Sequence, residues 1–98
     1  MDEHWQFEYM QPCWVNIYCP TLEDKDKSST FKIRREIYNQ FKELETKITD
    51  TFGLVGWVSH TKLENPHIMV FFSKIGAAPY YIDRKERKIW FKKFLKGV

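Results

Sequence analysis

A loop rich in lysine and hydroxyl side chains precedes the longest predicted helix, and its residue types suit the binding of an anion. The first N–H groups of a helix have no partner within the helix, and the helix dipole favours negative charge at that end. The sequence therefore predicts a phosphate-binding loop, although a solvated loop with an ordinary hydroxyl cap fits the same residues. The residues concerned are Lys25, Lys27, Ser28, Ser29 and Thr30.

The C-terminal segment is the second charged feature. Residues 84–98 carry a net charge of +6, which leaves −3 for residues 1–83 out of the total of +3. Such a basic segment attracts phosphate, nucleic acid or an acidic protein face. Lysines on a last strand also protect a sheet edge from aggregation, and we favour this second interpretation. The basic residues are Arg84, Lys85, Arg87, Lys88, Lys92, Lys93 and Lys96.

The two cysteines are expected to be free thiols. Cys13 and Cys19 lie six positions apart in a segment that is predicted to be extended. The rise along a strand would separate their Cα atoms by about 20 Å. A disulfide requires less than about 7 Å between the Cα atoms. Neither cysteine forms a closely spaced pair with His60 or His67, as a zinc site would require, so we expect no metal site.

Length and composition predict one folded domain over residues 1–98. The chain of 98 residues is 43% apolar, 17% aromatic and 30% charged, a mixture that excludes intrinsic disorder. No apolar run reaches the roughly 18 residues of a membrane span. The first four residues are acidic rather than basic, so we expect no signal peptide, no membrane contact and a cytoplasmic location.

The N-terminal half predicts two strands and a long helix. Residues 4–10 and 13–19 have the alternating or β-forming character of strands, and Gln11-Pro12 separates them. Residues 31–52 have one apolar stripe at helical spacing, and Gly53 provides a stop. The stripe comprises Ile33, Ile37, Phe41, Leu44, Ile48 and Phe52.

The C-terminal half predicts a buried strand, a short helix and a hairpin. Residues 54–58 are continuously apolar, which indicates a central strand covered on both faces. Asn65-Pro66 opens a helix that Gly76 closes. Residues 80–82 and 89–91 flank a polar turn and predict an antiparallel hairpin. The order β-β-α-β-α-β-β predicts an α/β (α+β) fold with a mixed central sheet.

This order resembles the C-terminal half of the GNAT superfamily of acyl-CoA N-acyltransferases. Residues 65–77, NPHIMVFFSKIGA, are similar to the family's short helix that begins at Asn and ends at Lys-Leu-Gly-Phe before a hairpin. The resemblance covers about residues 13–95. It implies that acetyl-CoA is the cofactor and that Asn65 and the lysine-rich loop, Lys25 to Thr30, hold it. The family's loop contains glycine, whereas this loop contains none.

The chemistry of the family is only partly matched. Many members place a Tyr in the short helix as the acid that protonates the leaving thiolate, and Phe72 stands there in this chain. Phenylalanine donates no proton. Tyr80 and Tyr81 are the replacement candidates, although packing within the hairpin also explains them. Candidates for the base are Glu8, His60 and His67, and each His also fits a polar role at a helix start or strand end.

Two function classes follow from the resemblance, and the basic segment provides a third. The first is a minimal acyltransferase that binds acetyl-CoA or a related thioester between strands 14–18 and 54–58 and acylates an amine. The alternative is a non-catalytic, bacteriophage-encoded binding module that acts through a protein partner or a homo-oligomer, in virion or head assembly or in inhibition of a host protein. The third, ranked last, is nucleic-acid binding through residues 84–96, with Trp90 and Phe91 as stacking platforms.

Overall fold

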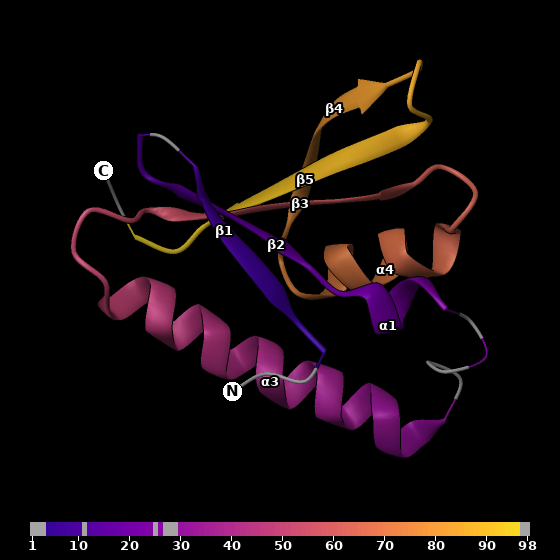
Figure 1. The fold of residues 1–98 in the computed structure, drawn as a ribbon, viewed down its shortest axis with the longest axis horizontal. Coiled ribbons are helices and arrows are strands. Elements are labelled where there is room, and N and C mark those ends of the chain that lie inside the picture. The colour runs from indigo at the N-terminus through magenta and orange to yellow at the C-terminus, as the bar shows by residue number, and fades with distance from the viewer. Residues whose placement is uncertain (1–3, 11, 25, 27–29, 97–98) are drawn as a thin grey trace.

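The computed structural model describes residues 4–10, 12–24, 26 and 30–96 of the chain, and those residues form one mixed sheet with helices (Figure 1). The elements, in chain order, are β1 (Gln6–Met10), β2 (Trp14–Tyr18), α1 (Pro20–Glu23), α3 (Phe31–Asp50), β3 (Gly56–Lys62), α4 (Pro66–Lys74), β4 (Ala78–Asp83) and β5 (Lys88–Phe94). The predicted α+β class and the order of the main strands and helices are confirmed, and the short α1 is the addition.

The sheet has the strand order β1-β2-β3-β5-β4 within the described residues. β2 and β3 are parallel and α3 connects them, whereas the β1–β2, β3–β5 and β4–β5 pairs are antiparallel. β3 therefore lies at the centre of the sheet, as its continuous apolar run predicts. β4 and β5 form the expected C-terminal hairpin, with a register shift between Pro79 and Tyr81.

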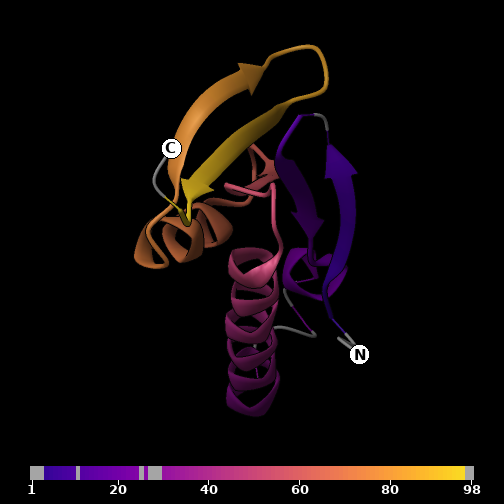
Figure 2. The ribbon, with the colours of Figure 1, turned by 90° about the vertical axis from the view of Figure 1, so that its left-hand side faces the viewer.

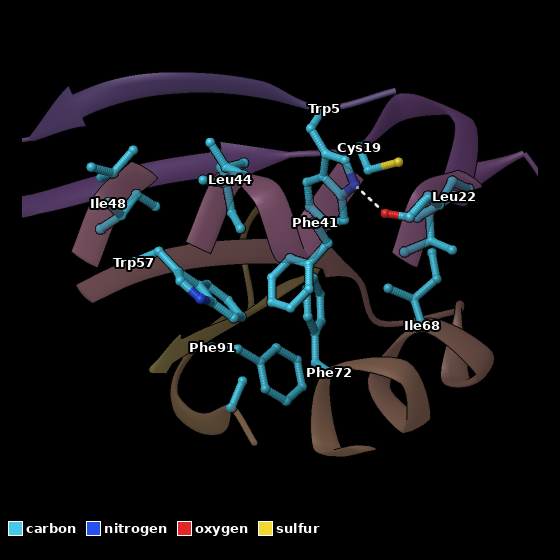
Figure 3. Close-up of a cluster of buried hydrophobic side chains, with 14 residues drawn as sticks. Trp5, Cys19, Leu22, Phe41, Leu44, Ile48, Trp57, Ile68, Phe72 and Phe91 are labelled. Atoms are coloured by element: carbon cyan, nitrogen blue, oxygen red, sulfur yellow. Dashed lines mark hydrogen bonds between the residues drawn. The ribbon is translucent and has the colours of Figure 1, made fainter. Parts of the chain in front are cut away.

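Both longer helices pack on the same face of the sheet. In Figures 1 and 2, α3 and α4 lie on one side while the β4–β5 hairpin rises away from them. Figure 3 shows the resulting core, in which Trp57 of β3, Phe91 of β5 and Phe72 of α4 come together. Trp5 joins the core from the segment before β1, and its Nε1 donates a hydrogen bond of 2.9 Å to the carbonyl oxygen of Ile37.

The apolar stripe of α3 is confirmed except at its end. Ile37, Phe41, Leu44 and Ile48 are buried, but Phe52 is 100% exposed. The prediction for Phe52 was wrong because the helix ends at Asp50, where the N–H of Thr51 bonds to the carbonyl oxygen of Ile48 at 3.2 Å. The chain then turns at Gly53, whose φ is +90°. No helix in the described ranges has the length and apolar character needed to cross a membrane.

Candidate functional site

The face of the sheet opposite α3 and α4 is hereafter called the open face, because no helix of the described residues packs on it. Side chains alternate between the two faces of a strand. Val15, Trp57 and Phe91 point toward the helices, so their neighbours along each strand point to the open face. From the register of the strands, the residues on the open face include Glu8, Met10, Trp14, Asn16, Tyr18, Gly56, Val58, His60, Lys62, Tyr81, Asp83, Lys88, Trp90, Lys92 and Phe94.

Aromatic rings form two rows across the open face. In one row, the ring of His60 lies 5.1 Å from the ring of Tyr18 and 4.5 Å from the ring of Trp90, centroid to centroid. Tyr81 lies opposite Trp90 on the neighbouring strand and extends this row. In the other row, the rings of Trp14 and Phe94 are 4.8 Å apart in an edge-to-face arrangement. The strands thus place flat, partly accessible rings on the side that the helices leave bare.

Lys92 of β5 lies between the two rows. Its Nζ is 5.1 Å from the ring centroid of Tyr80, 5.6 Å from that of Phe94 and 5.8 Å from that of Trp14. Each distance is within the range of a cation–π interaction, so the rings attract the ammonium group and hold it in place. The register shift at Pro79 and Tyr81 accompanies the placement of Tyr80 beside Lys92. The open face therefore combines a positive charge with exposed ring surface.

Gly56 lets the ring of Trp14 lie close to the backbone of β3. A Cβ atom at position 56 would lie 2.9 Å from Cζ3 of Trp14 and would overlap the carbonyl oxygen of Lys93. Glycine is the residue that permits such an approach, because it has no Cβ. Gly56 and Trp14 are direct partners in the parallel ladder, so this position sets the height of the aromatic row above the sheet.

Three of the rings are open to solvent. The exposed fractions are 46% for Tyr80, 55% for Tyr81 and 54% for Phe94. Trp14, Tyr18 and Trp90 are half-buried among their neighbours. Clusters of exposed rings on a folded domain mark an interaction surface more often than a single exposed apolar residue does. This surface is the strongest candidate site in the described residues.

Charge is unevenly distributed over the open face. Lys92 lies on β5, and Lys62 and Lys88 are paired at the end of the β3–β5 ladder, next to Asp83 of β4. The basic turn 84–87 continues from that end. Glu8 lies on β1, at the opposite edge. A negatively charged ligand is therefore attracted to the β3–β5–β4 side and repelled from the β1 side.

Not every lysine of the C-terminal segment contributes to this charge. Lys93 points to the helix face, where its Nζ lies 2.9 Å from Oε2 of Glu45. The same carboxylate accepts a hydrogen bond of 2.9 Å from Nε1 of Trp57. Lys96 donates a hydrogen bond of 2.6 Å to the carbonyl oxygen of Thr51. These two lysines bind to the domain itself, so the basic segment is partly structural.

His60 is half-buried within its aromatic row. Burial, followed by the nearby Lys88, lowers the pKa of its imidazole below the usual value. Its Nδ1 is buried and has no hydrogen-bond partner in the described residues. The neutral imidazole is therefore the form that the row of rings favours.

We expect the domain to become less stable in mild acid because of His60. The unfolded chain takes up a proton below about pH 6.5, whereas the folded state resists protonation until the lowered pKa of His60 is reached. The free energy of unfolding should therefore fall as the pH drops from about 6.5. Urea unfolding at several pH values measures it. The H60Q variant should lose the part of this fall that comes from His60. An equal fall of the free energy of unfolding in both proteins would contradict the role of His60.

The structure places Glu8 and the two tyrosines, three of the predicted proton-transfer residues, at opposite edges of the sheet. Glu8 lies on β1, whereas Tyr80 and Tyr81 lie on β4, with three strands between them. Strands are spaced by about 4.8 Å, so this separation is about 19 Å. Partial burial raises the pKa of Tyr80 above its usual value. His67 is exposed on α4. Glu8, His67 and the two tyrosines do not share a site at which one substrate could meet an acid and a base together. His60 lies in the row of Trp90, with β5 between it and Tyr81.

The predicted cofactor-binding residues are only partly within the described chain. Lys25, Lys27, Ser28 and Ser29 lie outside the described residues. Thr30 is the N-cap residue of α3, although its side chain makes no capping hydrogen bond. Asn65 precedes Pro66 at the start of α4, but its side-chain amide donates to the carboxylate of Glu23 in α1. Asn65 therefore connects α1 to α4.

A side-chain hydrogen bond connects β2 and β3 beyond the end of their ladder. The two strands pair from Trp14 to Asn16, and beyond that point the Oγ of Ser59 donates a hydrogen bond of 2.6 Å to the carbonyl oxygen of Ile17. Both Ser59 and Ile17 are buried. The acetyl-CoA site between these strands stays a prediction. The hydroxyl of Ser59 is already hydrogen-bonded next to the end of the ladder.

Both cysteines are free thiols. Cys19 is buried at the start of α1, and burial raises its pKa to about 11. A thiol with that pKa stays protonated at neutral pH and is a poor nucleophile. Cys19 therefore acts as a small core residue.

Sequence reasoning missed most of the open face. It paired Trp90 with Phe91 as stacking residues, but Phe91 is 2% exposed and points into the core. The available signal was the alternation in β5, where Lys88, Trp90, Lys92 and Phe94 share one face. The positions of Trp14, Tyr18 and His60 relative to β5 depend on the strand order, which periodicity does not provide.

A groove of about 390 Å³ lies between β1 and the C-terminal half of α3. Its lining is mainly apolar, and nothing in the structure indicates what covers it, so we assign it no function. The apolar residues that line it are Phe7, Tyr9, Val15, Leu44, Ile48 and Leu54.

No protein-family model, curated protein or solved structure matches this chain.

Proposed function

We propose that this domain is a non-catalytic binding module whose open face takes a ligand that combines flat aromatic rings with negative charge. The observation that carries the proposal is the position of Lys92, whose ammonium group lies among the rings of Trp14, Tyr80 and Phe94 on a face that no described helix covers. Rings on the ligand stack on this surface, and an anion on the ligand pairs with Lys92.

The arrangement of the predicted catalytic residues favours binding over catalysis. General acid–base catalysis requires an acid and a base within hydrogen-bond reach of one substrate. Glu8 and Tyr80 lie on the two edge strands of the sheet. His60 and Tyr81 lie on β3 and β4, on either side of Trp90 in β5, which separates them by about 10 Å. The pKa of Cys19 is too high for a nucleophile at neutral pH. The acyltransferase remains the second candidate. The parallel β2–α3–β3 unit and the basic first turn of α3, with Lys32, Arg34 and Arg35, favour it.

Both thiols are free, and thiols stay reduced in the cytoplasm. We therefore propose that the module is cytoplasmic. The proposed partner is bound without a change in its covalent structure.

The probe for this proposal is 8-anilinonaphthalene-1-sulfonate, which has two aromatic ring systems and one negative charge. We expect the native protein to bind it, with retained near-ultraviolet circular dichroism to exclude a loosely packed state. The K92Q variant should bind it at least several-fold more weakly. Fluorescence titration measures both affinities.

Lys42 of α3 offers a matched control. Its Nζ lies 5.8 Å from the ring centroid of Tyr38, so it is also a lysine over a tyrosine ring, but it lies on the helix side of the domain. The K42Q variant removes the same charge and should leave the binding unchanged. Equal losses in K42Q and K92Q, or no binding by the wild type, would overturn the proposal.

Acetyl-CoA separates the two candidate functions. At 100 times its dissociation constant, a ligand stabilises the folded state by about 2.7 kcal/mol. The acyltransferase candidate predicts a thermal shift with millimolar acetyl-CoA that R34E/R35E removes and K92Q leaves in place. The binding module predicts no shift that depends on Arg34 and Arg35.

A further inference from the structure

We infer that the ligand of the open face is single-stranded nucleic acid. This inference rests on the proposed function and names the polymer that combines flat rings with regularly spaced negative charge. The bases of a single strand are free to stack on aromatic side chains, and its phosphates attract lysine and arginine. The open face presents both groups on neighbouring strands.

The ring surface is suited to unpaired bases. Tyr80 and Tyr81 are about half exposed, and Tyr81 continues the row formed by Trp90, His60 and Tyr18. Phe94 is exposed on the other side of Lys92. Trp90 and Phe94 are four residues apart on β5, which separates the two rows by about 13 Å along the strand. Different bases of one strand can therefore occupy the two rows.

The charges indicate the path of the backbone. Lys92 lies between the rows, and Lys62 and Lys88 lie beyond the Trp90 row, next to the basic turn 84–87. A phosphate chain that passes Lys92 and continues toward that turn meets positive charge at both ends of its path. Glu8 at the β1 edge repels phosphate. We therefore place the strand over β3, β5 and β4.

Charge and rings together favour a single strand over a duplex or a protein. The bases of a duplex are stacked within the helix, so exposed tyrosine rings have nothing to stack on. An acidic protein segment would use Lys92 but would leave most of the ring surface without flat partners. The ring rows are therefore the feature that selects the single strand.

The test is fluorescence anisotropy with a labelled oligothymidine of about twelve nucleotides, a length within the range that single-strand binders cover. We expect wild-type protein to bind this oligonucleotide more tightly than a duplex of the same length. The affinity should fall as the salt concentration rises, because bound phosphates release counterions.

Two substitutions separate stacking from charge. Y80L should weaken binding by about 5- to 150-fold without a change in the salt dependence, because a stacked base loses its partner. K92Q should weaken binding and reduce the slope of log affinity against log salt by about 0.7, the value for one phosphate contact to a single strand. The matched controls Y38L and K42Q alter the other lysine–tyrosine pair and should bind as the wild type does.

Four outcomes would overturn the inference. One is no binding of the oligonucleotide at low salt. A second is binding to a duplex that is as tight as binding to the single strand. A third is an equal effect of Y80L and Y38L, which would leave only non-specific attraction. The fourth is a dimer, seen by sedimentation, that Y80L dissociates and that excludes the oligonucleotide, in which case the open face holds a second copy.

The failure of this inference is distinguishable from the failure of the proposed function. If the naphthalene sulfonate binds in a manner that requires Lys92 but the oligonucleotide does not bind, the binding module stands and its partner is not a nucleic acid. If neither probe binds, both proposals fail.

Discussion

Replacing Phe41 with alanine is expected to lower the free energy of unfolding by about 3–5 kcal/mol. Phe41 is 1% exposed and contacts three other rings, with centroid distances of 5.5 Å to Trp5, 5.6 Å to Trp57 and 6.3 Å to Phe71. The substitution removes the ring that connects α3, β3 and α4, and it leaves a cavity that the surrounding side chains fill only in part. Urea unfolding followed by far-ultraviolet circular dichroism measures this loss.

Phe52 provides the control for Phe41. It lies just beyond the C-terminus of α3 and is 100% exposed, so the same change to alanine removes no buried contact. We expect F52A to change the free energy of unfolding by less than about 0.5 kcal/mol. Similar losses in F41A and F52A would mean that α3 does not pack through the Ile37, Phe41, Leu44 and Ile48 face.

The second large effect is expected at Gly56, where alanine should destabilise the fold by about 1–3 kcal/mol or more. The added Cβ would overlap the carbonyl oxygen of Lys93, which is backbone and cannot rotate away. It would also lie against the ring of Trp14 and displace the aromatic row that includes Phe94. G56A should therefore reduce both the stability and the binding of the naphthalene sulfonate probe.

A double-mutant cycle separates the two contacts of that Cβ atom. If the backbone overlap dominates, G56A in a W14A background should still cost most of what it costs in the wild type. A G56A substitution that becomes harmless once Trp14 is removed would show that the ring alone limits this position. Denaturant titration of the four proteins gives the coupling energy.

Local patterns predicted the two longer helices, α3 and α4, because their determinants are close in the sequence. The apolar spacing of α3, the Asn65-Pro66 start of α4 and the polar turn of the hairpin each depend on a few neighbouring residues. Helical periodicity and capping are short-range effects, so they are readable without the fold. The end of α3 was less predictable, because Phe52 continues the apolar spacing although the helix ends at Asp50.

The candidate site could not be predicted in the same way, because it depends on strand order and register. β5 lies between β3 and β4, which brings Lys92 next to Trp14, a residue 78 positions earlier in the chain. The register shift between Pro79 and Tyr81 accompanies the contact of Lys92 with the ring of Tyr80. These long-range pairings have no local sequence signal, and a shift of one residue would move each side chain to the other face.

The continuous apolar run at residues 54–58 predicted a strand covered on both faces. β3 is buried on both faces, but different groups cover each face. Its residues Gly56 to Ser59 are buried, yet helices cover only the side that Trp57 faces. On the open face, Gly56 lies under the ring of Trp14, and Val58 is flanked by Asn16 and Lys92. Large neighbouring side chains therefore bury the central strand without a second layer of helices.

Titration of ¹⁵N-labelled protein with oligothymidine, followed through the amide resonances, shows whether the open face is the binding surface. We expect the largest changes at Asn16, Val58, His60 and Lys92 and at the hairpin residues Tyr80 and Tyr81, with little change along α3. Changes confined to Thr30 and the first turn of α3, or spread evenly over both faces, would contradict this expectation.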